Sequence, residues 1–123
     1  MRTILVVDDS PTIRKMVRAA LGGLQDVAFV EAGTGLQAIE TLAMHPVRMV
    51  VLDLNMPDMH GFEVLGFIRG HQALADIPVA ILTTRGDEES RSAAASAGAS
   101  AYFTKPFVGG TFAPAIARLL ERA

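Results

Sequence analysis

Cysteine is absent from this sequence of 123 residues. Its absence excludes a disulfide scaffold, thiolate zinc sites and thiol redox chemistry. A chain without cysteine is compatible with a reducing compartment, and we expect a cytoplasmic protein. Half of the residues are hydrophobic, so a chain of this length can bury a core without disulfides or structural metals.

Long hydrophobic runs and clusters of basic residues are also missing. The first apolar run, Ile4 to Val7, is far shorter than a signal-peptide core or a membrane span of about 20 residues. Thirteen acidic residues against eleven basic ones give a net charge of −2, with no basic run that could follow a phosphate backbone. We therefore expect a soluble chain that binds neither a membrane nor nucleic acid directly.

Five short segments have the composition of β-strands. Most are apolar throughout rather than alternating, which indicates strands covered on both faces, as in a parallel sheet flanked by helices. The segments are Ile4 to Val7, Val27 to Val30, Met49 to Leu52, Val79 to Leu82 and, as the weakest, Ala101 to Phe103.

A helical pattern follows each segment. Ser10 and Pro11 are typical of an N-cap and a first helical position, and Pro114 is expected in or near the first turn of the fifth helix. The fourth helix, about Glu88 to Ala97, has almost only small side chains, so we expect it to pack most loosely and to be mobile. Apolar residues at helical spacing are expected to face the core: Ile13, Met16, Val17, Ala20, Leu21, Leu36, Ile39, Leu42, Ala43, Phe62, Leu65, Ile68, Phe112, Ile116, Leu119 and Leu120.

The alternation of strands and helices predicts one α/β domain over residues 1–123. We expect a doubly wound (βα)5 fold with a five-stranded parallel sheet, helices on both faces and right-handed crossovers. Ligands of such sheets bind at the carboxyl ends of the strands. The residues that follow each strand are therefore the candidate site.

Aspartates follow two of the strands. Asp8 and Asp9 come directly after the first predicted strand, and Asp53 comes directly after the third. Neighbouring carboxylates repel one another, and oxygen donors without histidine or cysteine favour Mg²⁺. Taken singly, each site has an alternative explanation, a helix cap for Asp8 and Asp9 and a turn for Asp53. The second strand ends in Glu31 and Ala32, to which we assign no role.

Thr83 and Thr84 follow the fourth strand and Lys105 follows the fifth. Lysine is scarce, because Lys15 and Lys105 are the only two among eleven basic residues. A compact ammonium suits an anionic phosphoryl group as a point charge. The alternative for Lys105 is a solvated surface side chain.

Together these motifs resemble the receiver domain of two-component response regulators, and are most similar to the single-domain, CheY-like type of chemotaxis. The resemblance covers nearly the whole chain. It implies a flavodoxin-like sheet in the strand order 2-1-3-4-5 and a phosphorelay function. The matching segments are Ile4 to Ser10, Asp53 to Pro57 with Gly61, Ile81 to Thr84, Ala97 to Ala99 with Tyr102, and Lys105 to Phe107.

The resemblance implies that Asp53 is the phosphoacceptor, a carboxylate nucleophile that forms an acyl phosphate. It also implies a Mg²⁺ site in which Asp8 and Asp9 are joined by Asp53 and the backbone carbonyl of Asn55. Lys105 resembles the lysine that contacts the phosphoryl oxygens. Such a reaction needs positioning and charge neutralisation more than acid–base catalysis.

Further residues match positions of the family that govern switching. Thr83 resembles the hydroxyl that turns toward the phosphoryl group, and Tyr102 resembles the aromatic that moves inward behind it. Thr84, beside Thr83, is also expected to contact the phosphoryl group. Asn55 and Arg85 occupy positions that influence the phosphoryl lifetime. The family also implies a cis peptide bond between Lys105 and Pro106.

The resemblance implies a sensor histidine kinase or a small phosphodonor as phosphate source and a separate protein as target. The chain ends directly after the fifth helix, so we expect output through a surface made by the fourth helix, fifth strand and fifth helix. We expect no conventional enzyme activity beyond the chain's own phosphorylation and dephosphorylation. A monomer, or a weak dimer formed on phosphorylation, is expected.

Two alternative functions stay open. One is a degenerate receiver that only binds proteins, although the presence of Asp53, Thr83 and Lys105 disfavours it. The other is an aspartyl phosphatase of the haloacid dehalogenase type, which normally has an acid where this chain has Asn55. Gly33-Thr34-Gly35 resembles a dinucleotide loop only faintly and lacks a third glycine at the required position.

Overall fold

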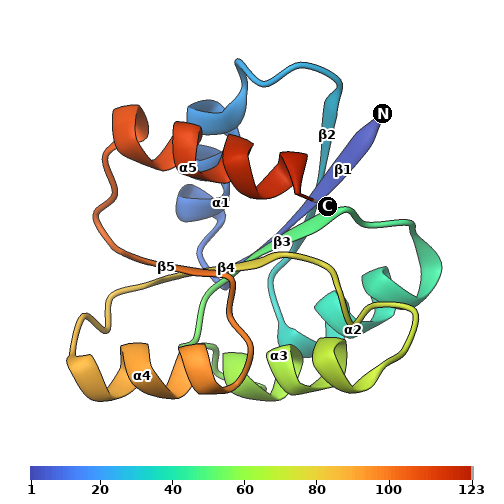
Figure 1. The fold of residues 1–123 in the computed structure, drawn as a ribbon, viewed down its shortest axis with the longest axis vertical. Helices are drawn as coiled ribbons and strands as arrows, with labels where there is room; N and C mark the ends of the chain where they lie inside the picture. The colour runs from blue at the N-terminus through green and yellow to red at the C-terminus, as the bar shows by residue number, and fades with distance from the viewer. Residues whose placement is uncertain (123) are drawn as a thin grey trace.

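The five expected strands form one parallel sheet in the computed structural model, which describes residues 1–122. The strand order across the sheet, β2-β1-β3-β4-β5, confirms the prediction. The first strand, β1, lies between β2 and β3 (Figure 1). Each strand is equal to or longer than its predicted segment. The bounds are β1 Arg2–Val7, β2 Val27–Ala32, β3 Met49–Leu52, β4 Val79–Thr83 and β5 Ala101–Thr104.

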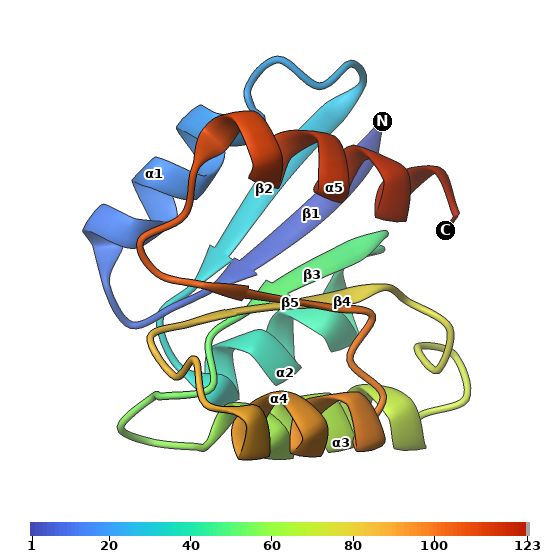
Figure 2. The same cartoon turned by 60° about the vertical axis from the view of Figure 1, so that its left-hand side comes forward.

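Five helices cover the sheet in two layers, with α1 and α5 on one face and α2, α3 and α4 on the other (Figure 2). The helices are α1 Pro11–Leu21, α2 Gly35–Met44, α3 Gly61–Gly70, α4 Glu88–Ser96 and α5 Gly109–Glu121. The predicted doubly wound architecture is therefore confirmed. No helix within residues 1–122 combines the length and the apolar character that a bilayer crossing needs.

The α1 helix begins where the sequence predicts. The Ser10 hydroxyl accepts a hydrogen bond from the Ile13 amide at 3.2 Å, and Pro11 occupies the first helical position. Such a cap satisfies a backbone donor that the first turn would leave unpaired. The Asp8-Asp9 segment is thereby fixed between a strand end and a capped helix.

The two faces of the sheet carry separate hydrophobic cores. Between the sheet and α1/α5 lies a core that includes Val17, Phe112 and Ile116. Between the sheet and α2, α3 and α4 lies a second core that includes Leu65 and Ile68. Both faces of the central strands are thus covered, which is why β3 and β4 are buried along their whole length.

The α2 helix differs from its expected orientation. It buries Gly35, Ala38 and Leu42, whereas Leu36 is 58% exposed. Gly35 lies against Met59, whose Cβ would be 2.6 Å from a Cβ at position 35. This close approach turns the small residues of α2 inward, so the expectation that Leu36 faces the core is wrong.

Three smaller expectations need correction. Met16 on α1 is 44% exposed rather than buried, and Ala43 on α2 is also exposed. The α5 helix begins at Gly109, so Pro114 falls in its second turn. The α4 helix buries only Ser90 and Ala94, in agreement with the sparse anchoring that its composition predicts.

Candidate functional site

The carboxyl ends of β1 and β3 bring the predicted acids together. Val7 and Leu52, the last residues of the two strands, are partners in the sheet, and the Asp53 amide donates to the Val7 carbonyl at 3.0 Å. Asp8 and Asp53 therefore follow neighbouring strands side by side. One carboxylate oxygen from each of Asp8, Asp9 and Asp53 lies within 4.8 Å of the others.

Lys105 reaches this acidic cluster from the end of β5. Its Nζ lies 2.7 Å from Asp8 Oδ2 and 3.1 Å from Asp53 Oδ2. Its own amide donates to the Thr83 carbonyl at 2.8 Å, and the peptide bond that follows, Lys105–Pro106, is cis. The lysine is thus held by the backbone of β4 and directed at two acids.

The electrostatics of the cluster favour a further cation. Asp8 and Asp53 are only 2% and 4% exposed. Burial raises the pKa of Asp8, and the nearby charge of Asp53 adds to that rise. Burial alone would lower the pKa of Lys105, but its hydrogen bonds and charge interactions with both acids outweigh burial and raise it. Three carboxylates face one ammonium, which leaves an excess of negative charge.

The donor set fits Mg²⁺. The oxygens of Asp8, Asp9 and Asp53 are hard ligands, and Asp9 is exposed, so an ion can reach the site from solvent. Backbone amides orient the two buried acids: Ser10 donates to Asp8 Oδ1 at 2.9 Å and Asn55 donates to Asp53 Oδ1 at 3.1 Å. The carboxylates are therefore positioned before any ion binds.

Thr83 lies behind the cluster at the end of β4 and is fully buried. Its Oγ1 is 3.5 Å from Nδ2 of Asn55, which connects it to the loop that follows Asp53. Thr84, the next residue, is exposed. The two threonines thus differ, because only Thr83 lies in the interior.

Tyr102 is on β5, and its ring lies against Arg91 of α4. Its hydroxyl donates to the carbonyl of Arg85, and the Arg91 guanidinium lies 4.9 Å from the centre of its ring. Tyr102 and Arg85 are therefore in direct contact. This contact links the loop after Thr83 to the surface of α4 and β5.

Gly61, the first residue of α3, allows the helix to pack closely against the backbone of Asp53 and Leu54. Its amide donates to the Leu54 carbonyl at 2.9 Å. A Cβ at position 61 would collide with the Asp53 carbonyl oxygen and would lie 2.6 Å from Leu54 Cα. The sequence motif includes this glycine, and the structure gives the reason, since any side chain would displace the backbone of Asp53.

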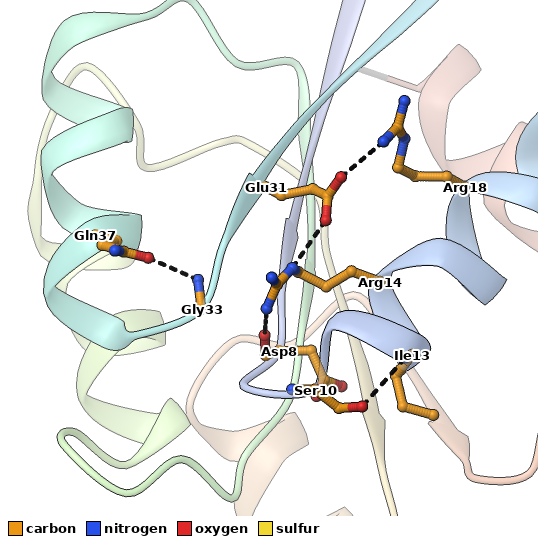
Figure 3. Close-up of polar contacts among 8 residues, drawn as sticks. All are labelled: Asp8, Ser10, Ile13, Arg14, Arg18, Glu31, Gly33 and Gln37. Atoms are coloured by element: carbon orange, nitrogen blue, oxygen red, sulfur yellow. Dashed lines mark hydrogen bonds and ion pairs between the residues drawn. The ribbon is translucent and has the colours of Figure 1, made fainter.

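Three residues at this edge, Arg14, Arg18 and Glu31, were given no role from the sequence. Arg14 on α1 donates to the backbone carbonyl of Asp8 at 2.6 Å and to Glu31 at 2.8 Å, and Arg18 pairs with the same Glu31 at 2.8 Å (Figure 3). Glu31, the last residue but one of β2, is therefore connected to the candidate site through Arg14. A local signal existed, because an acid stands next to the end of β2, the strand that neighbours Asp8.

The chain is similar to known signalling proteins. The profile of the response regulator receiver domain matches residues 4–117. The transcriptional regulatory protein KdpE of Mycobacterium tuberculosis is 40% identical over 107 residues, which are 87% of this chain and 46% of KdpE. The chain therefore spans less than half the length of that relative.

Two further relatives match along almost their whole length. Chemotaxis protein CheY-3 of Vibrio cholerae is 36% identical over 119 residues, which are 97% of this chain and 92% of that protein. The crystal structure of the Mn²⁺-bound form of response regulator Rcp1 has a TM-score of 0.87 at 27% identity, covering 100% of this chain and 97% of Rcp1.

Proposed function

Because the chain belongs to the response regulator receiver domain family, we propose that it accepts a phosphoryl group on Asp53 in a Mg²⁺-dependent reaction. The observation that carries this proposal is the meeting of Asp8, Asp9, Asp53 and Lys105 at one edge of the sheet. The receiver domain is a signalling domain rather than a conventional enzyme. We propose that residues 1–123 act as one such domain.

In the proposed reaction a carboxylate oxygen of Asp53 attacks phosphorus in line with the leaving group. The new oxygen–phosphorus bond forms as the bond to the donor breaks, and the donor leaves with the electron pair. Lys105, 3.1 Å from Asp53 Oδ2, is placed to neutralise the phosphoryl oxygens. Mg²⁺, held by Asp8, Asp9, Asp53 and the Asn55 carbonyl, would supply the remaining positive charge.

The proposed switch starts at Thr83. Its buried hydroxyl is the one hydroxyl on β4, and it lies 3.5 Å from the side-chain nitrogen of Asn55 in the Asp53 loop. A phosphoryl group on Asp53 would offer Thr83 a stronger acceptor, and Tyr102 would respond through the Arg85 segment that it contacts. We propose that Thr84 assists at the phosphoryl group, and that Asn55 and Arg85 tune its lifetime.

A sensor histidine kinase is the proposed phosphate source, and a separate protein is the proposed target. The similarity to a chemotaxis protein makes chemotaxis one candidate pathway. The α4 helix buries only two small side chains, so the face formed by α4, β5 and α5 can shift at a small cost in packing. We propose this face as the output surface.

The decisive test is phosphorylation of the wild-type chain. Incubation with acetyl phosphate and Mg²⁺ should add the mass of one phosphoryl group, which alkali removes as expected of an acyl phosphate. Chelation of Mg²⁺ should prevent the gain, and Mg²⁺ alone should raise the melting temperature because it binds only the folded site. Intact-mass spectrometry and thermal unfolding measure both effects.

Other outcomes of this assay favour other functions. An alkali-stable serine or threonine ester would contradict the proposed chemistry. Absence of any mass gain, together with absence of a Mg²⁺ effect on melting, would favour a degenerate receiver that only binds proteins. Continuous release of phosphate from unrelated monoesters would favour the phosphatase alternative.

Replacement of Thr83 by alanine should separate phosphorylation from the switch. The variant retains Asp53 and Lys105, so it should still gain one phosphoryl group. Backbone amide shifts that accompany phosphorylation should be lost across residues 83–107 outside the site, because the hydroxyl that responds is gone. Two-dimensional amide NMR with and without phosphodonor measures this pattern.

Thr83→Ser is the matched control, since it keeps the hydroxyl and removes only a methyl group. It should reproduce the wild-type shifts. If Thr83→Ala shows the full wild-type pattern, the proposed switch is wrong even where Asp53 is the acceptor.

A further inference from the structure

Arg14 makes an unusual set of contacts beside the acidic cluster. One guanidinium nitrogen, Nη1, lies 2.6 Å from the backbone carbonyl of Asp8, and Nε lies 2.8 Å from Glu31 Oε1. Only 17% of the Arg14 side chain is exposed. Figure 3 shows the guanidinium lying between the end of β1 and the end of β2, with Glu31 on one side and Asp8 on the other.

Glu31 is held in turn from two sides. Its Oε2 accepts from Arg18 at 2.8 Å, while Oε1 accepts from Arg14. These bonds lower the pKa of Glu31, with the Arg14 hydrogen bond as the largest cause. Glu31 therefore stays ionised and holds the Arg14 guanidinium in one orientation through a charge-assisted hydrogen bond.

The carbonyl that Arg14 binds belongs to the peptide unit between Asp8 and Asp9. A peptide unit is planar, so a hydrogen bond on its oxygen restricts the orientation of the whole unit. Asp8 has other restraints, because its carboxylate pairs with Lys105 and accepts from the Ser10 amide. Asp9 is exposed, so its place in the cluster depends on the backbone that precedes it.

We infer that Arg14 is a positioning residue for the cation site, with Glu31 fixing its guanidinium. The inference rests on the proposed function, because it concerns Mg²⁺ at Asp8, Asp9 and Asp53. Arg14 acts through the Asp8–Asp9 peptide unit and needs no contact with the ion. Some groups orient the ligands of a metal without touching the metal itself. Their removal commonly lowers the metal affinity by about 10- to 100-fold.

Charge alone predicts the opposite effect. Arg14 is a cation close to a cation site, so its removal should strengthen Mg²⁺ binding if electrostatics dominated. If Arg14 instead positions the Asp8–Asp9 peptide unit, its removal should weaken Mg²⁺ binding. The direction in which the Kd for Mg²⁺ changes therefore distinguishes the two explanations.

The test compares Arg14→Met with Arg18→Met. Both substitutions remove one positive charge from α1 and one bond to Glu31, but only Arg14 contacts the Asp8 carbonyl. In calorimetric titration of the whole chain with Mg²⁺ at constant ionic strength, Arg14→Met should raise the Kd about 10-fold or more. Arg18→Met should stay within about twofold of the wild type, since it leaves the Asp8 contact in place.

A second measurement separates affinity from chemistry. In the acetyl phosphate assay, Arg14→Met should need more Mg²⁺ for half-maximal phosphorylation, while the rate at saturating Mg²⁺ should approach that of the wild type. Arg14→Lys should recover only part of the affinity, because one ammonium cannot replace both guanidinium contacts. Should Arg14→Met fail to fold by circular dichroism, Arg14→Lys is the substitute. It keeps the positive charge, so charge alone predicts an unchanged Kd, whereas loss of one of the two guanidinium contacts predicts a several-fold rise in Kd.

The outcomes are distinct. Unchanged or tighter Mg²⁺ binding by folded Arg14→Met, or by Arg14→Lys when it is the substitute, would overturn the positioning role and leave the proposed function intact. Equal weakening by Arg14→Met and Arg18→Met would also overturn it. Absence of Mg²⁺ binding by the wild type would overturn the proposed function together with this inference.

Discussion

Replacement of Asp53 by asparagine should abolish the gain of a phosphoryl group from acetyl phosphate. The side chain is 4% exposed and has one oxygen bonded to the Asn55 amide and the other to Lys105. Asparagine matches its shape and can still accept the Asn55 bond, but a neutral amide cannot act as the carboxylate nucleophile. Intact-mass spectrometry should show the wild-type gain and no gain in the variant.

Asp58→Asn is a suitable control, because it removes a carboxylate five positions along the same loop. Asp58 accepts hydrogen bonds from the amides of Gly35 and Leu36 at 3.0 and 3.2 Å, at the start of α2. Asparagine keeps one acceptor oxygen for these amides, and Thr34 still caps the helix, so this variant should fold and should be phosphorylated like the wild type. Retention of an alkali-labile phosphoryl group by Asp53→Asn would assign the acceptor to another residue.

Replacement of Gly61 by alanine should destabilise the fold strongly. The added Cβ would meet the backbone of Asp53 and would lie 2.6 Å from Leu54 Cα. Backbone atoms cannot rotate away as a flexible side chain can, so α3 or the Asp53 loop must move. We expect a loss of about 3 kcal/mol in the free energy of unfolding, the upper end of the usual range for overpacking. Urea denaturation without Mg²⁺ measures this loss.

Gly66→Ala on the same helix should have the opposite sign. Gly66 is exposed and a Cβ there meets nothing within 4 Å. Alanine should therefore raise the free energy of unfolding by up to about 1 kcal/mol through helix propensity alone. Equal effects of the two substitutions would show that close approach at Gly61 does not limit stability.

The residues of the acidic cluster could be predicted because each stands directly after a recognisable strand. Asp53 follows four buried apolar residues, and Asp8 follows another such run. In a parallel sheet the carboxyl ends of the strands share one edge, so local pattern and topology suffice to bring these acids together. The proximity of these acids can therefore be predicted without knowing how any side chain packs.

The roles of Arg14 and Leu36 could not be predicted in the same way. The bond between Arg14 and Glu31 joins residues 17 positions apart, and it depends on how α1 is rotated above the sheet. The exposure of Leu36 depends on Gly35 lying against Met59 from another loop. Periodicity identifies the apolar residues of a helix, but it does not decide which of them a neighbouring segment will cover.

The division of the interior into two cores has a consequence for engineering. Free-energy changes at sites more than about 7–10 Å apart, without shared partners, usually add. The sheet separates the core that contains Val17 and Ile116 from the core beneath α4. Stabilising substitutions can therefore be accumulated around α1 and α5 with little coupling to Ala94 on α4. A thermostable variant made in this way would resist global unfolding and keep the local equilibrium of α4.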